Sequence, residues 1–426
     1  MLETIDLSIF PKPFYHSPGT VLTLGDLHAN PILFIYFLQK NGVISISRQT
    51  YLKLYKLYQQ IGQQQEFDPN SWNLELQKQY FSFLKLLDEL VINPCRIKIR
   101  LLGDELADRG ECDLFIMLIL SQLHDHGIHF SILVSNHGVT FLSSLQYILG
   151  EQKLDHHNRM LSDENMRSFL ALQKVVFYQV ISKNWIKKWL KNVYLPHLEL
   201  LDYGYSHDSR YFYIFTHAAM GFKQLRALTA EYQIDWKDND MDALAGTLKN
   251  LKNMFRYQKK EELITLFRNN ARDPDAKLIQ KHLIETVFWR DLIWNRKYES
   301  IRPFKQHSYL VFNVHGHDQG FKKHHDYFLS LDSALGKYYY NIQGQMKTLV
   351  IQERRYSHKK TEAKALPGFS IFKPYINCLP SLNQSLLILG IGVLVKYQCS
   401  IMPLSPFIDY IYEQFLSYSK LKLVKN

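Results

Sequence analysis

The sequence predicts an α/β (α+β) fold in which short buried strands alternate with longer helical segments. Two observations support this prediction. Five short apolar runs each stop at a small cluster of Asp, Asn or His residues. Between these runs, apolar residues recur at helical spacing. With 46% hydrophobic and 21% charged residues, the chain has a globular composition, which excludes a collagen, a coiled coil and a disordered tail.

The elements are expected in the following order. Strands are predicted at 21–24, 97–102, 130–134, 211–216 and 309–314, and two or three further short strands across 327–351. Helices are predicted across 31–92 with a break at 68–71, and across 112–126, 140–200 and 223–295. We expect a central mixed β-sandwich flanked by helices.

The composition changes near residue 352, which divides the chain. Residues 1–351 are expected to form the main domain. Large helical insertions are expected within it at about 40–92, 140–205 and 223–290. Residues 352–364 are charged and lack apolar periodicity, so 352–426 is predicted to be a linker and a small C-terminal element of unknown role.

The net charge of +11 favours anionic partners. No cluster of basic residues accompanies a DNA-binding pattern, so we expect no nucleic-acid partner. The longest apolar run, 386–395, is ten residues long, too short for a membrane-spanning helix. A buried element is the simpler interpretation of this run, and membrane contact remains an alternative.

Cysteine usage indicates a reducing compartment such as the cytosol. The four cysteines are scattered and form no CxxC pair: Cys95, Cys112, Cys378 and Cys399. This spacing argues against both a disulfide framework and a zinc-thiolate site. The first residues lack a basic segment followed by an apolar run, so no Sec-type signal is expected.

The polar clusters at the strand ends form a candidate metal site. In chain order they read GDLH at 25–28, GDELADRG at 103–110, NH at 136–137, a single His217, and HGH at 315–317. Ligands of open α/β sheets bind outside the carboxyl ends of the strands. Carboxylate, imidazole and amide groups together suit Mn, Fe or Zn. Each cluster alone is a weak signal, and their order makes the pattern specific.

That order resembles the phosphoprotein-phosphatase branch of the calcineurin-like metallophosphatases, whose motifs are GDxHG, GDxVDRG, GNHE, an isolated His and a late GH. The resemblance covers roughly residues 20–350. It implies a β-sandwich flanked by helices that carries two divalent metal ions, with Mn most expected and Fe or Zn possible. The ligands would be Asp26 and His28 on the first ion, Asp104 between the ions, and Asn136, His217 and His317 on the second.

The resemblance also implies roles around the metals. A hydroxide held by the two ions would attack the phosphorus atom in line. Arg109 would clamp the phosphate with its planar fork. His137 would be the general acid, oriented by Asp108. Arg296 is a candidate second phosphate contact, and His315 is expected to pack beside the site rather than bind metal.

The sequence also departs from the family motifs. Ala29 and Asn30 stand where a glycine usually follows DxH, and one extra residue precedes Asp108. Ser135 and Gly138 replace the Gly and Glu that flank the NH pair, so a supporting carboxylate is expected to be missing. With its helical insertions, the chain looks most like the Wip-type effector phosphatases of Legionella. That likeness implies delivery into a host cell by type IV secretion.

The function implied is a metal-dependent protein phosphatase that acts on phosphoproteins, carrying phosphoserine, phosphothreonine or phosphotyrosine, in a host cell. A small-molecule hydrolase acting on dinucleoside polyphosphates is an alternative, because bacterial relatives share these motifs. A non-catalytic binding module is a second alternative. Its signature would be a lost ligand, and none of the six expected ligand positions is lost.

Overall fold

The computed structural model describes residues 2–64, 74–109, 113–151, 163–206, 210–259, 293, 295, 309–317 and 327–352. The chain divides into two compact units, Met1–Arg355 and Tyr356–Asn426. All described residues belong to the first unit. The predicted C-terminal element and the apolar run at 386–395 lie outside the described residues.

The larger sheet has six strands among the described residues, in the order β1–β12–β2–β5–β6–β7. Its strands are Leu2–Asp6 (β1), Thr20–Leu24 (β2), Lys98–Leu101 (β5), His129–Leu133 (β6), Leu198–Glu199 (β7) and Gln343–Gln352 (β12). Strands β2, β5, β6 and β7 run parallel to one another, and β12 is antiparallel to β1 and β2. The parallel strands therefore all end at one edge of the sheet.

A second sheet of four strands has the order β11–β10–β9–β8 within the described part of the chain. Its strands are Asp202–Tyr205 (β8), Tyr211–Thr216 (β9), Leu310–His315 (β10) and Phe328–Ser330 (β11). Strands β9, β10 and β11 are parallel, and β8 is antiparallel to β9. A short ladder of Ile44–Ser45 (β3) and Val91–Ile92 (β4) lies apart from both sheets.

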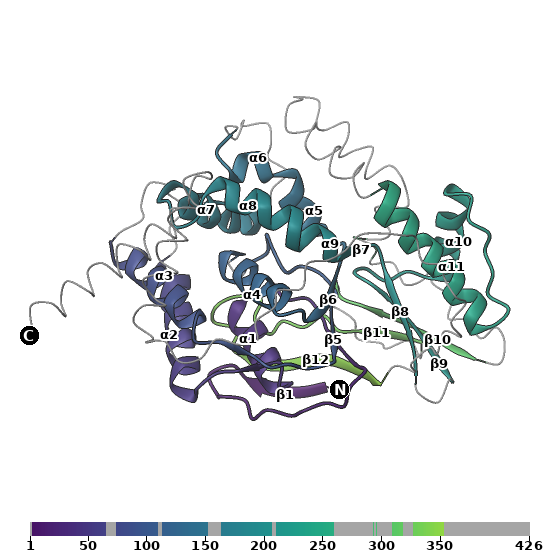
Figure 1. Cartoon of the computed structure of the whole chain (residues 1–426), viewed down its shortest axis with the longest axis horizontal. Coiled ribbons are helices and arrows are strands. Elements are labelled where there is room, and N and C mark those ends of the chain that lie inside the picture. The colour runs from purple at the N-terminus through teal and green to yellow at the C-terminus, as the bar shows by residue number, and fades with distance from the viewer. Residues whose placement is uncertain are drawn as a thin grey trace, which may run out of the picture. The chain divides into compact units, whose positions relative to one another are not determined.

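Helices cover these sheets (Figure 1). In the first half they are Pro31–Lys40 (α1), Arg48–Gln64 (α2), Leu74–Leu87 (α3), Asp113–Asp125 (α4), Asn136–Ser143 (α5) and Leu145–Ile148 (α6). Further along are Asp163–Phe177 (α7), Lys183–Trp189 (α8), Leu195–His197 (α9), Phe222–Glu231 (α10) and Met241–Met254 (α11). Single π-helical turns follow α8 at Leu190–Tyr194 (η1) and α11 at Phe255–Lys259 (η2). Helix α4 packs on α1 and β6, and α11 packs on β8.

Helix α1 begins at a cap that explains one departure from the family motifs. The Asn30 side chain accepts hydrogen bonds from the backbone N–H groups of Ile32 and Leu33, both at 3.0 Å. Its amide also donates to the Gly336 carbonyl. Pro31 occupies the first helical position, where no N–H is needed. Asn30 therefore fixes the start of α1 directly behind the Asp26 loop.

The two sheets pack against each other through a small apolar core of their own. Its residues come from both sheets: Leu102, Leu133 and Ile351 follow or belong to the larger sheet, and Phe215, Val314 and Leu331 to the smaller. A much larger apolar cluster contains residues of the helices, of the larger sheet and of strands β9 and β10. The predicted mixed α/β sandwich with flanking helices is confirmed.

A buried arginine also links the two sheets. The Arg100 side chain on β5 is fully buried and its Cζ lies 3.6 Å from the centre of the Phe215 ring on β9. Its guanidinium donates to the Asp202 carboxylate on β8 at 2.6 and 2.7 Å, and to the Thr23 hydroxyl on β2. Because the cation is fully paired and stacked, its burial does not leave an uncompensated charge.

The strands that the sequence did not predict are short or polar. Strand β8 reads DYGY, and its glycine and charge hide the alternation that marks a strand. Strand β7 has only two residues, and β1 lies at the sheet edge. Their pairing is decided by neighbouring strands rather than by local sequence. The predicted break at 68–71 lies outside the described residues.

Candidate active site

The strand ends place the predicted site residues at one edge of the two sheets. Asp26 follows β2, Asp104 follows β5, and Asn136 opens α5 directly after β6. His217 and His317 follow β9 and β10 in the second sheet. Because these strands run parallel within each sheet, their carboxyl ends meet.

Four of these residues form one buried cluster. Asp26, Asp104, His217 and His317 each offer one ligand atom, and these atoms all lie within 4.8 Å of one another. The His317 backbone N–H donates to Asp26 Oδ2 at 2.9 Å. Asp26 Oδ1 is buried and has no hydrogen-bond partner among the described residues. An unsatisfied carboxylate oxygen beside three other ligand atoms is a site that a divalent cation fits.

His217 turns an acceptor toward this cluster. Its Nδ1 lies 2.8 Å from the Leu102 carbonyl, to which it donates. In the neutral ring, Nε2 then carries a lone pair, and it faces Asn136 Oδ1 at 2.7 Å and Asp104 Oδ1 at 3.4 Å. Burial lowers the pKa of His217, which favours the neutral ring. The lone pair of this nitrogen therefore faces two oxygen atoms that are also acceptors. A cation between them would stabilise this arrangement.

The two carboxylates of the cluster differ in their proton affinity. Burial and the nearby Asp332 and Asp104 carboxylates raise the pKa of Asp26 well above its usual range. Burial also disfavours ionised Asp104, but His217 and His137 outweigh it and lower the pKa of Asp104. The pKa values of two buried carboxyl groups in one site commonly differ in this way, because repulsion between like charges makes it costly to ionise both.

The loops of the site have strained backbones. Left-handed φ angles occur at His28 (54°), Ala29 (50°), Asp104 (53°), Ala107 (57°) and His317 (45°). Such conformations are costly for residues other than glycine, and they cluster at functional sites. Ala29 adopts this conformation at the position where the family motif has glycine.

Two glycines allow the cluster to close. A Cβ atom on Gly316 would lie 1.8 Å from Asp26 Oδ1, so only glycine fits between the two loops. Gly103 has a φ of 122°, and a Cβ there would lie 2.6 Å from His217 Nδ1. The Ser135 hydroxyl accepts hydrogen bonds from the N–H groups of Asp104 and Gly138, both at 3.0 Å. It thereby ties the Asp104 loop to the start of α5.

His28 lies beside the cluster with both ring nitrogens facing protein acceptors. Its Nδ1 lies 2.7 Å from Asp108 Oδ2, and its Nε2 lies 2.9 Å from the Ser333 carbonyl. Burial opposes the charged ring, but Asp108 and Asp332 outweigh it and raise the pKa of His28. His28 is not one of the four clustered residues. Its predicted role as a ligand stays a prediction.

His137, Asp108 and Arg109 form a second group next to the cluster. Asp104, Asp108 and His137 also bring ligand atoms within 4.8 Å of one another. Asp108 Oδ1 lies 3.1 Å from Arg109 Nη1 and 3.5 Å from His137 Nε2, while His137 Nδ1 lies 3.0 Å from the Ala107 carbonyl. Asp108 therefore contacts His28 more closely than it contacts His137. Burial lowers the pKa of His137, but Asp108 and Asp104 outweigh it and raise that pKa overall.

The extra residue of the GDELADRG motif is accommodated by a turn. Ala107 takes a left-handed conformation, and its N–H lies 3.2 Å from both oxygens of Asp113. Asp113 in turn accepts a hydrogen bond from the Ser168 hydroxyl on α7. This turn returns the chain so that Asp108 is buried beside Asp104. The spacing change therefore does not remove Asp108 from the site.

A buried carboxylate, Glu105, lies near Gly138, the position at which the family motif has a glutamate. Glu105 Oε1 would lie 3.6 Å from a Cβ on Gly138, and the Tyr194 hydroxyl would lie 2.9 Å from it. Tyr194 donates to Glu105 Oε1 at 2.5 Å, and burial raises the pKa of Glu105 to about 7. The Glu105–Tyr194 pair thus fills the space that a longer side chain at 138 would need. Position 138 itself carries no carboxylate, as the sequence analysis expects.

Asp332 is a site residue that the sequence analysis missed. It is 4% exposed, and its Oδ1 lies 3.6 Å from His28 Nε2. Like the other site residues, Asp332 follows a strand, β11. The sequence analysis expects only short strands across 327–351 and no site residue among them. Of the other residues considered from the sequence, Arg296 lies outside the described residues. His315 is buried, and its Nδ1 lies 2.6 Å from the Gly316 carbonyl oxygen.

Fold and site together define an enzyme of the phosphatase class, and comparison with known families agrees. The family model described as WipA-like, phosphatase domain, matches residues 98–337. Because this match spans more than half of the chain, the protein belongs to the WipA-like phosphatase family. The predicted resemblance to Wip-type phosphatases is confirmed.

A solved structure gives the same result. The crystal structure of the phosphatase domain from the Legionella effector WipB is similar to this chain, with 27% sequence identity and a TM-score of 0.55. The similarity covers 71% of this chain and 100% of that domain. No curated protein matches the sequence. In the described part of the chain, no helix is both long and apolar enough to span a membrane.

The close approach at Gly316 gives a first prediction. In Gly316→Ala, the new methyl group would displace the Asp26 carboxylate, so phosphatase activity should fall at least about tenfold. Gly246→Ala is the matched control, because a Cβ there meets nothing within 4 Å and helix α11 should be stabilised by about 0.5–1 kcal/mol. Activity and thermal unfolding of both variants test this. Full activity in Gly316→Ala would contradict the geometry of the Asp26 loop.

Proposed function

We propose that this chain is a metal-dependent protein phosphatase that hydrolyses phosphomonoesters on phosphoproteins. One observation carries the proposal. Asp26, Asp104, His217 and His317 bring four buried ligand atoms within 4.8 Å, and Asp26 Oδ1 has no hydrogen-bond partner in the described part of the chain. Membership of a phosphatase family makes phosphate ester hydrolysis the reaction that such a cluster serves.

The proposed metal ligands are the predicted ones: Asp26, His28, Asp104, Asn136, His217 and His317. This set of oxygen and nitrogen donors suits Mn, with Fe or Zn as alternatives. When bound, two such ions supply a nucleophile near neutral pH and neutralise charge on the phosphate oxygens. Support for the position of Asn136 comes from its Oδ1, which faces the same His217 Nε2 as Asp104 does.

The proposed catalytic residues lie next to these ligands. Arg109 would bind two phosphate oxygens, while Asp108 holds one end of its guanidinium. His137 would protonate the leaving oxygen, and its contact with the Ala107 carbonyl fixes the ring. Asp108 Oδ1 lies 3.5 Å from His137 Nε2, so Asp108 would favour the charged form of His137 by electrostatic attraction rather than by a close hydrogen bond. Arg296 is retained as a second proposed phosphate contact.

The biological setting is also a proposal. The WipB domain comes from a Legionella effector, which supports action on host phosphoproteins after type IV secretion into the host cytosol. The catalytic domain would comprise residues 1–351, with 352–426 as an appended element. Hydrolysis of dinucleoside polyphosphates remains the rival, because the same site chemistry would serve both substrates. A non-catalytic module is disfavoured, because the cluster keeps its ligands.

Phosphate release from matched phosphotyrosine, phosphoserine and phosphothreonine peptides tests the proposal directly. We expect release with Mn²⁺ and loss of release with a chelator. The preferred peptide then identifies the substrate class. Release from dinucleoside polyphosphates but from none of the peptides would support the rival function instead.

Asp104→Asn should reduce this release at least about 100-fold, because one carboxylate serves the whole cluster and even supporting groups of metal sites are worth 10–100-fold. Asp125→Asn is the matched control, an exposed aspartate at the end of α4 that should leave the rate unchanged. Substantial turnover by metal-loaded Asp104→Asn would contradict the proposed two-metal site.

His137→Ala tests the general acid through the leaving group. A general acid contributes about 10²–10⁴-fold, and most where the leaving oxygen is a poor one. Release from a phosphoserine peptide should therefore fall about 100-fold, and hydrolysis of p-nitrophenyl phosphate much less. His126→Ala, at an exposed histidine, serves as control. An equal loss on both substrates would argue against this role for His137.

A further inference from the structure

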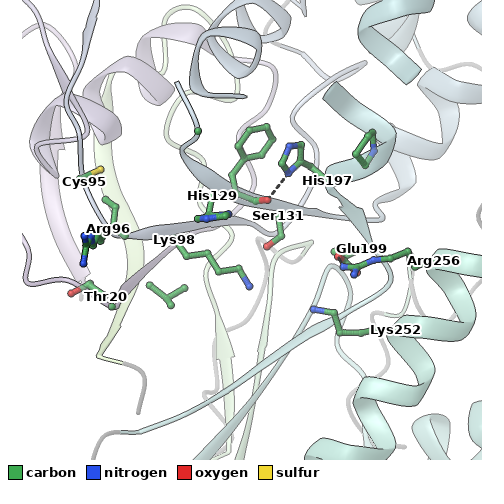
Figure 2. A pocket seen from close by; sticks show the side chains of 16 residues that line it. Thr20, Cys95, Arg96, Lys98, His129, Ser131, His197, Glu199, Lys252 and Arg256 are labelled. Atoms are coloured by element: carbon green, nitrogen blue, oxygen red, sulfur yellow. Dashed lines mark hydrogen bonds and ion pairs between the residues drawn. The ribbon is translucent and has the colours of Figure 1, made fainter. Parts of the chain in front are cut away.

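A cavity lies at the opposite ends of the strands that carry the active site. Its volume is about 760 Å³, within the range of small-molecule sites. It opens where β2, β5 and β6 begin, whereas Asp26, Asp104 and Asn136 follow the ends of these strands. Helix α11 and η2 close another side (Figure 2). None of the proposed catalytic or metal-binding residues lines this cavity.

Positive charge dominates the lining. Four cationic side chains line the cavity, against one carboxylate, Glu199. The cations are Arg96, Lys98, Lys252 and Arg256. Arg256 pairs with Glu199 Oε1. The cavity therefore keeps an excess of positive charge after this pairing.

The carboxylate behind the lysines does not cancel that excess. Asp202 is buried and accepts from Lys98 Nζ and Lys252 Nζ at 2.6 Å each. The same carboxylate also takes the Arg100 guanidinium at 2.6 Å, so three cations share one negative charge. Burial and the nearby Arg100 and Lys252 charges lower the pKa of Lys98, although Asp202 opposes them. Each ammonium group has three N–H donors, which leaves donors for a ligand.

A buried hydroxyl lies between these ammonium groups. Ser131 on β6 is 5% exposed, and its Oγ has no hydrogen-bond partner among the described residues. Figure 2 shows Ser131 projecting into the space between Lys98, Lys252 and Glu199. Glu199 Oε2 is likewise buried without a partner in the described part of the chain. Unsatisfied buried polar atoms of this kind are costly unless a ligand or water pairs with them.

We propose that this cavity binds a small hydroxylated phosphate ester, such as a sugar phosphate, a polyol phosphate or a nucleotide. Its phosphate would accept from Lys98, Lys252 and the Ser131 hydroxyl, which are donors suited to a phosphate oxygen. A hydroxyl of the same ligand would donate to Glu199 Oε2. Inorganic phosphate alone would leave most of the cavity empty and would leave Glu199 without a donor. The site is separate from the catalytic one and does not depend on the metals.

Calorimetric titration of the full-length chain tests this proposal. The Asp104→Asn background is used so that the probes are neither hydrolysed nor held at the catalytic cluster. The probes are glucose 6-phosphate, AMP and myo-inositol 1-phosphate, each beside its unphosphorylated form and inorganic phosphate. We expect at least one phosphate ester to bind, and to bind more tightly than its unphosphorylated form and than inorganic phosphate.

Variants then locate the binding. Lys252→Gln should weaken it about tenfold, because one charge-assisted contact is lost. Ser131→Val should weaken it several-fold while all charges are kept, so it remains informative if Lys252→Gln fails to fold. Lys249→Gln removes the same charge from an exposed position of α11 and should have no effect. Absence of binding by every probe, or binding that neither Lys252→Gln nor Ser131→Val weakens, would overturn the proposal.

Discussion

Two buried carboxylates that repel each other, Asp26 and Asp104, set the conditions for the rest of the structure. Two sheets must pack so that strand ends from both surround these groups with His217 and His317. Burial and repulsion raise the pKa of Asp26, and the nearby histidines lower that of Asp104. A cluster of acceptors at this density is stable only with cations, supplied by protons or by metal ions. Packing of the surrounding structure keeps the loops around the cluster in their strained conformations.

Strand β5 runs through the interior of the sandwich and has residues of opposite charge at its two ends. Asp104 follows this strand at one end, and Lys98 begins it at the other. Between them, Arg100 crosses to Asp202 and Phe215 of the second sheet. An acidic cluster therefore lies beyond one end of β5, and the cationic lining of the cavity lies at the other end.

The sequence predicted the parts of this site that depend on local pattern. The strands before Asp26, Asp104, Asn136, His217 and His317 are apolar runs that end abruptly, and the structure has strands at all five places. The short strands β7 and β8 escaped prediction, because their pairing depends on neighbours far along the chain.

Contacts between distant segments could not be predicted from pattern alone. Glu105 lies near Gly138 although the two residues are far apart in the sequence. Asp332 contacts His28 although the two residues are far apart in the sequence. His28 itself fits the expected motif, yet its two nitrogens face Asp108 and Ser333. Such partners are decided by packing in three dimensions rather than by spacing in the sequence.

A titration of metal-free protein with Mn²⁺ tests the central claim most directly. The account predicts saturation at two ions per chain, and loss of both binding events in Asp104→Asn, because in the proposed site this carboxylate would hold both ions. The exposed Asp125→Asn variant should bind as the unaltered chain does. Failure of the folded protein to bind Mn²⁺, Fe²⁺ or Zn²⁺, or two ions retained by Asp104→Asn, would contradict the account.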